Sequence, residues 1–155
     1  ENPVYTDTFR ELGANAIPMA WTEALTAMQQ GTIDGQENPV NVIHSFKLNE
    51  TQAHMTLTRH TYAPAIFVMG MPSWNQLPEA AQQVLVEAAQ EAAEHERRVN
   101  AEMEADQLAE LRAAGMQVIE EPDLEAFQTA VAPVYEKYGE QFGDYLERIQ
   151  EALDQ

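Results

Sequence analysis

The sequence predicts an α/β fold, because short apolar segments typical of strands alternate with longer segments of helical periodicity. Residues 65–69 form an unbroken apolar run, which is typical of a strand covered on both faces. Residues 78–114 contain no glycine, and no proline after the first position, as expected of a long helix. With 155 residues, the chain is long enough to bury an ordinary core. We expect residues 1–155 to form a single region.

The first third of the chain predicts two helices and two short strands. An Asn-Pro pair at the start and Gly13 at the end delimit a short first helix. Thr22 is a good N-cap for a second helix, and Gly31 can adopt the left-handed conformation that ends it. The strands are expected at residues 14–19 and 32–34.

The middle of the chain predicts further strands over residues 55–58 and 64–71. A short helix is expected between these strands and the second helix. It covers residues 39–46, and its apolar residues are expected to face inward at Val40, Ile43 and Phe46.

The long helix over residues 78–114 is the most informative element for the architecture. At 1.5 Å per residue it measures about 54 Å, whereas the radius of gyration of a 155-residue globule is only about 15 Å. We therefore expect it to kink or to lie across a second body. The residues expected to face inward recur every three or four positions and are mostly small or apolar: Ala81, Val84, Ala88, Ala92, His95, Val99 and Met103.

The last forty or so residues predict one more strand and two closing helices. The strand is expected at residues 116–120 and the helices at 123–138 and 144–153, with a break near residues 139–143.

The charge of the chain excludes several classes of partner. Against 26 Asp and Glu there are only 8 Lys and Arg, and the net charge of −18 would repel nucleic acid and anionic membranes. The carboxylates are spread along every predicted helix, which indicates a surface adapted to high salt or simply an acidic protein. Cysteine is absent. The sequence also contains no apolar run of about 18 residues, the length needed to span a membrane.

Residues 18–39 combine an aromatic side chain and a polar loop at the two ends of one helix. The first loop carries Trp21, and the second carries amide and carboxylate groups over residues 34–39. Because the helix between them is rigid, these groups should be held in a fixed relation, as a small polar ligand requires.

The second loop, Asp34-Gly35-Gln36-Glu37-Asn38-Pro39, closely resembles the signature of DctP-type solute-binding proteins, the extracytoplasmic receptors of tripartite ATP-independent periplasmic (TRAP) transporters. The resemblance covers essentially the whole chain, but only about the second half of such a protein. It continues at three further places: Leu57-Thr58-Arg59-His60-Thr61-Tyr62, Trp74 with Leu77-Pro78, and Gly115-Met116-Gln117-Val118.

The resemblance implies a periplasmic receptor that captures an organic acid, either a C4-dicarboxylate or a sugar acid, and delivers it to a membrane permease. It implies a lobe like that of other periplasmic binding proteins, with a long helix that spans both lobes of the intact receptor. Ligand would close the two lobes about a hinge. No cofactor, metal or catalytic activity is implied.

Four residues are candidates for ligand contacts. Taken alone, Trp21 reads as a core anchor, Asn38 as a turn residue before proline, and His60 as a structural histidine. The resemblance instead implies that Trp21 packs on the ligand, that Asn38 bonds a carboxylate or hydroxyl, and that His60 lies nearby. Asn2 is expected to be a remnant of another wall of the site, because the resemblance implies that the arginine that clamps the carboxylate in this family lies on a strand upstream of residue 1.

Two other classes of function remain open. Asp34, Glu37 and His60 could serve a hydrolase or lyase, and the acidic helix 78–114 could be an interaction scaffold without a small-molecule site. The histidines show no zinc-binding spacing. If the other lobe is absent, the chain should bind ligand weakly or not at all. Alternatively, its long helix and unpaired sheet edges should be covered by another copy or by the missing piece.

If the surface is adapted to high salt, the melting temperature should rise steadily as NaCl is added, because screening weakens repulsion among the carboxylates. Thermal melts over a NaCl series measure this. If the Tm does not rise, the protein is simply acidic and its surface is not adapted to high salt.

Overall fold

The computed structural model describes residues 2–153, which form eight α-helices, one 3-10 turn and two short strands. The chain divides into two units, and each is described by itself. The first consists of Glu1–Asp34 with Glu120–Gln155, and the second of Gly35–Ile119. Helices thus predominate, and the strands form one small parallel sheet, as an α/β chain requires.

In the first unit, α1 (Pro3–Glu11) and α2 (Trp21–Gln30) confirm the two predicted helices. Asn2 caps α1, because its Oδ1 accepts a hydrogen bond of 2.9 Å from the Val4 N–H. Gly31 ends α2 with a φ of +66°. Thr22 does not cap α2, since the helix already begins at Trp21.

Residues 14–19 and 32–34 are not strands, so both predictions are wrong. A strand needs a neighbour for its backbone hydrogen bonds, and within residues 2–153 only β1 and β2 pair in a sheet.

The C-terminal part of the first unit contains three helices rather than two. These are α6 (Leu124–Ala130), α7 (Ala132–Phe142) and α8 (Tyr145–Leu153). The predicted helix 123–138 breaks at Val131, and Pro133 follows in the first turn of α7, where its missing N–H costs nothing. The predicted break at 139–143 is narrower, at Gly143, whose φ is +57°.

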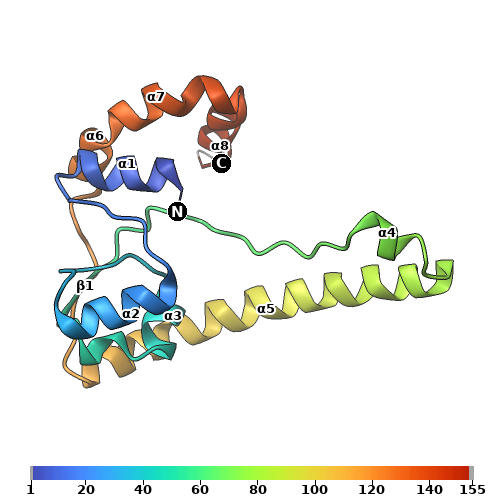
Figure 1. Ribbon diagram of the computed structural model, residues 1–155, viewed down its shortest axis with the longest axis horizontal. Helices are drawn as coiled ribbons and strands as arrows, with labels where there is room; N and C mark the ends of the chain where they lie inside the picture. Colours follow the sequence, from blue (N-terminus) through green and yellow to red (C-terminus); the bar gives the residue numbers. More distant parts are fainter. Residues whose placement is uncertain (1, 154–155) are drawn as a thin grey trace. The chain divides into compact units, whose positions relative to one another are not determined.

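Asp7 joins α1 to α7, which lie side by side (Figure 1). Its Oδ2 accepts hydrogen bonds from Lys137 Nζ at 2.6 Å and from the Tyr138 hydroxyl at 2.7 Å, across 130 residues of sequence. Arg10 lies 3.3 Å from the other carboxylate oxygen. The hydrogen bonds from Lys137 and Tyr138 lower the pKa of Asp7, and the same carboxylate raises the pKa of Lys137.

The second unit contains α3 (Val40–Ser45), the turn η1 (Leu48–Glu50), β1 (His54–Thr56), α4 (Met71–Trp74), α5 (Glu79–Ala113) and β2 (Gln117–Ile119). The strands β1 and β2 confirm two predicted strands. They pair in parallel, with His54 opposite Gln117 and Thr56 opposite Ile119, so α5 lies in the crossover between them.

The core of the second unit lies where α3 packs against the C-terminal turns of α5. A side-chain contact of 2.7 Å between His44 Nε2 and Glu110 Oε2 links the same two helices. Phe46 does not face inward as predicted, since it is 49% exposed just after α3 ends. The buried apolar residues of this core are Ile43, Leu48, Met55, Leu111 and Met116.

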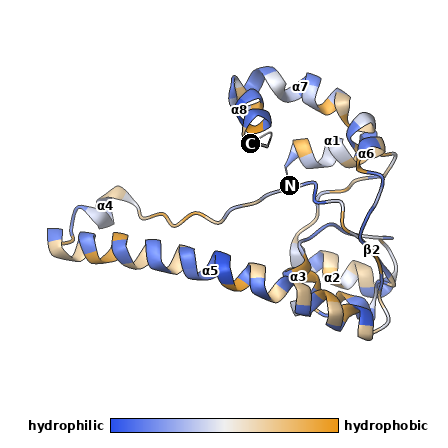
Figure 2. Cartoon of the chain, turned by 180° about the vertical axis from the view of Figure 1, so that it is seen from behind, coloured by the Kyte–Doolittle hydropathy of each residue, from blue (hydrophilic) through white to orange (hydrophobic). Residues whose placement is uncertain are grey.

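The long helix is confirmed, since α5 runs without interruption for 35 residues, or about 52 Å. Its predicted inward face is wrong for most of its length. Of the seven predicted positions, Ala81 and Val99 are half-buried and the others are exposed. Burial is confined to Gln107 and Leu111 near the C-terminal end, because the rest of α5 extends beyond α3 and the strands (Figure 2).

Residues 64–71 do not form the predicted buried strand. The segment between β1 and α4 runs as irregular extended chain, and Val68 at its centre is 87% exposed. No described residue supplies a neighbouring strand there, so neither the backbone ladder nor the apolar cover that the prediction assumed is present within residues 2–153.

No helix within residues 2–153 combines the length and the apolar character needed to cross a lipid bilayer.

Replacing Asp7 with Asn should lower the Tm of the complete protein by a few degrees, because the carboxylate that holds Lys137 and Tyr138 is lost. The folded pKa of Asp7 lies below its unfolded value of about 3.9, so this stabilisation is complete above pH 4 or so and is lost as the pH falls through the folded pKa. Thermal melts between pH 2 and pH 7 measure the difference. Asp106→Asn, an exposed aspartate of α5, is the control. Equal melts for both variants would contradict the role of Asp7.

Candidate functional site

In the loop that follows Gly35, successive side chains alternate between half-buried and exposed. Gln36 and Asn38 are half-buried, whereas Glu37 between them is exposed. This alternation is expected of extended backbone, in which successive side chains point in opposite directions. Pro39 favours extended backbone at Asn38, so Gln36 and Asn38 share one side of the loop.

Three side-chain amides form a chain of hydrogen bonds on that side. Asn38 Nδ2 donates to Gln36 Oε1 at 2.6 Å, and Gln36 Nε2 donates to Gln52 Oε1 at 3.2 Å. Gln52 lies just after η1, 16 residues from Gln36. The loop is thereby fastened to the segment that leads into β1.

The exposed residue of the loop contacts His60. His60 Nε2 lies 3.3 Å from Glu37 Oε2, and His60 Nδ1 lies 2.7 Å from the Thr58 hydroxyl. Arg59, between the two, has a φ of +46°, which is uncommon outside glycine and turns the backbone so that Thr58 and His60 meet. Both ring nitrogens of His60 therefore have a polar neighbour.

The structure thus brings His60 to the loop that carries Asn38, because His60 contacts Glu37, the residue before Asn38. The other two predicted residues lie in the first unit. Trp21 is the first residue of α2 and is half-buried, and the Asn2 side chain is engaged in capping α1. That all four line one cleft stays a prediction.

Sequence reasoning missed the roles of Gln52 and Thr58. Gln36 entered it only as one residue of the loop motif. The alternation of side chains in the loop could have paired Gln36 with Asn38, but nothing in the local sequence indicates Gln52, because the contact depends on the path of the chain through α3 and η1.

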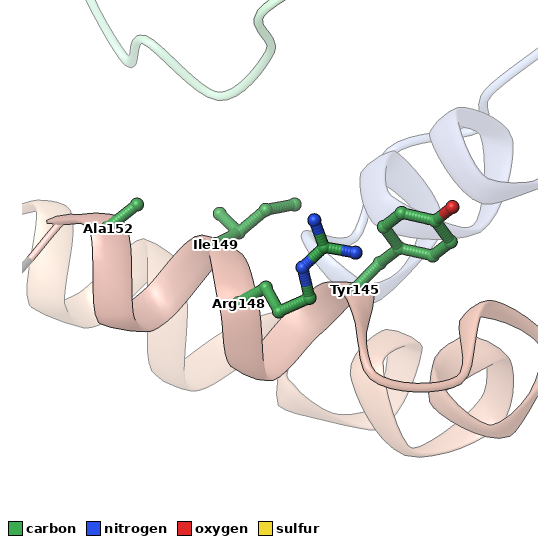
Figure 3. A pocket seen from close by; sticks show the side chains of 4 residues that line it. All are labelled: Tyr145, Arg148, Ile149 and Ala152. Carbon is green, nitrogen blue, oxygen red and sulfur yellow. The ribbon is translucent and has the colours of Figure 1, made fainter.

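Two surface hollows are lined by none of these residues. One runs along a single face of α8 and is lined by Tyr145, Arg148, Ile149 and Ala152, with the Arg148 guanidinium 5.2 Å from the Tyr145 ring centre (Figure 3). The other lies on α5. Since each is lined by one helix alone, neither surrounds a ligand. Within the described chain, no three His, Asp or Glu residues gather as metal ligands would.

Comparison with known families gives one match. Residues 1–141 match the family model DctP, described as bacterial extracellular solute-binding protein, family 7.

Curated relatives match nearly the whole chain. A solute-binding protein of Verminephrobacter eiseniae is 44% identical over 98% of this chain, which corresponds to 46% of that protein. The 2,3-diketo-L-gulonate-binding periplasmic protein YiaO of Escherichia coli is 35% identical over 97% of this chain and 47% of that protein. The chain therefore spans about half the length of the curated relatives that it matches.

A solved structure is similar in fold to this chain. A TRAP periplasmic solute-binding protein from Polaromonas sp. JS666, bound to D-erythronate, has a TM-score of 0.89 and 43% sequence identity. It covers 97% of this chain, which corresponds to 49% of that structure.

Proposed function

Because the chain belongs to the DctP family of bacterial extracellular solute-binding proteins, we propose that it forms part of a TRAP-transporter receptor that captures an organic acid. Family membership confirms the resemblance that the loop motif indicated. Members of this family bind solutes as receptors, and the receptor function of the whole protein is proposed here for this chain.

The ligand class follows from the relatives. The Polaromonas structure holds D-erythronate, and the Escherichia coli protein is named for 2,3-diketo-L-gulonate. Both are acids derived from sugars. We therefore favour a sugar acid over a simple C4-dicarboxylate for this chain.

Four residues are proposed to contact the acid. The Trp21 ring would pack on its carbon chain, and Asn38 would bond a carboxylate or hydroxyl. His60 and Asn2 would lie beside them. The observation that carries the proposal is the hydrogen-bonded loop around Asn38 and His60, because it holds polar side chains in place at a position that the family motif marks.

The chain is proposed to supply one lobe, the long helix and the closing helices of a two-lobed receptor. Two features support this. The chain matches about half of each of the three relatives described above, and the second unit exposes an apolar segment at residues 64–71 together with most of α5. Exposed apolar surface of this extent requires a cover. Ligand that contacts both lobes would shift the population toward a closed form.

The proposed location is the periplasm, the proposed partner is the membrane permease of the transporter, and the proposed activity is binding without turnover. The exposed face of α5 also favours a second candidate function, an acidic helical scaffold without a small-molecule site. The two differ in whether any small acid binds.

A thermal-shift screen of the complete protein against sugar acids and C4-dicarboxylates tests the proposal. We expect at least one sugar acid to raise the Tm until its binding site is saturated, since a ligand that binds only the folded state stabilises that state. The acid should be recovered unchanged afterwards. A consumed acid would indicate an enzyme. No shift with any acid would favour the scaffold.

Replacing Trp21 with Ala should weaken binding of the acid about tenfold or more, because the site loses the aromatic face that packs on the ligand. The Tm of the ligand-free protein should stay within a few degrees, since Trp21 is only half-buried. Isothermal titration calorimetry and melts give both values. Trp74→Ala, the only other tryptophan, is the matched control and should leave affinity unchanged. Equal affinity losses in the two variants would contradict the role of Trp21.

A further inference from the structure

We propose that Gln36 and Gln52 are positioning residues that fix the orientation of the Asn38 amide, and that this orientation selects acids carrying a hydroxyl next to the carboxylate. The inference rests on the proposed function, in which Asn38 contacts the ligand. It goes further by naming the groups of the ligand that Asn38 recognises and the residues that set this preference.

The chain of amides has a direction. Asn38 donates to Gln36, and Gln36 donates to Gln52. A carbonyl oxygen cannot donate, so rotating the Asn38 amide by 180° would bring two oxygens together unless Gln36 and Gln52 also rotate. Because three side chains must turn at once, the observed orientation of Asn38 is held against reversal.

The hydrogen bond to Gln36 acts on the torsion that is otherwise least restricted. Pro39 favours extended backbone at Asn38. The terminal torsion of an asparagine side chain is broad, however, and sterics alone do not decide which way its amide faces. The 2.6 Å hydrogen bond to Gln36 Oε1 fixes which way the amide faces.

In this orientation Asn38 offers a ligand one donor and one acceptor. One amide hydrogen is engaged with Gln36, which leaves the second hydrogen and Oδ1. A carboxylate accepts from the hydrogen but gives nothing to Oδ1, whereas a hydroxyl can donate to Oδ1. An acid with a hydroxyl on the neighbouring carbon satisfies both atoms, and an acid without it leaves Oδ1 desolvated and without a donor.

Calorimetric titration of the complete protein with D-erythronate and with 3,4-dihydroxybutanoate, which lacks only the 2-hydroxyl, measures this preference. We expect the unaltered protein to favour D-erythronate about tenfold or more. Gln36→Glu still accepts from Asn38 and should keep most of that ratio. Gln36→Lys can only donate, should turn Oδ1 of Asn38 toward position 36, and should bring the ratio close to one.

Gln83→Lys is the matched control, because Gln83 also donates a hydrogen bond through Nε2, in its case to the Glu87 carboxylate, but lies on the exposed face of α5. It should keep the ratio of the unaltered protein. In an Asn38→Ala background, Gln36→Lys should have no further effect on the ratio, since a positioning residue acts only through the residue it positions. An unchanged ratio in Gln36→Lys, or an equal effect with and without Asn38, would overturn the inference.

Failure of the proposed function is separate from failure of this inference. If no acid of the screen binds, the receptor function fails, and NMR of the ligand-free protein still tests the amide chain. The two side-chain amide hydrogens of Asn38 should change chemical shift in Gln36→Lys and keep their shifts in Gln83→Lys. Unchanged Asn38 signals in both variants would overturn the positioning role.

Discussion

The packing of α3 against the C-terminal turns of α5 is the constraint on which the second unit depends. Ile43 and Leu111 are buried in this contact, and the pair between His44 and Glu110 links the same helices. The parallel pairing of β1 with β2 brings both ends of the α5 crossover to this place. The loop 35–39 leads directly into α3, so the packing of α3 fixes the C-terminal end of the loop that carries these polar side chains.

The loop itself is organised by side chains rather than by backbone ladders. The amide chain through Gln36 fastens one side, and the contact between Glu37 and His60 fastens the other. A pre-organised polar group loses less entropy when ligand binds, so such fastening favours affinity.

Sequence reasoning succeeded where the signal is local and failed where it needed a neighbour. Gly31 and the uninterrupted run of α5 identified their elements, because helices satisfy their own backbone. The apolar run 65–69 predicted burial, yet Val68 is exposed, because burial requires a second surface. For the same reason, five of the seven positions of α5 that were predicted to face inward are exposed. The prediction for α3 was right for Ile43 but wrong for Phe46. Asn38 and His60 were candidates because two separate stretches of the sequence resemble the family, whereas nothing in the sequence indicated Gln52.

A structure of the complete protein with D-erythronate bound would test the central claim most directly. The account predicts that the Asn38 amide lies within hydrogen-bonding distance of the acid, with Oδ1 facing a hydroxyl, and that the Trp21 ring packs on its carbon chain. An acid held elsewhere, with Trp21 and Asn38 both packed against protein alone, would contradict it.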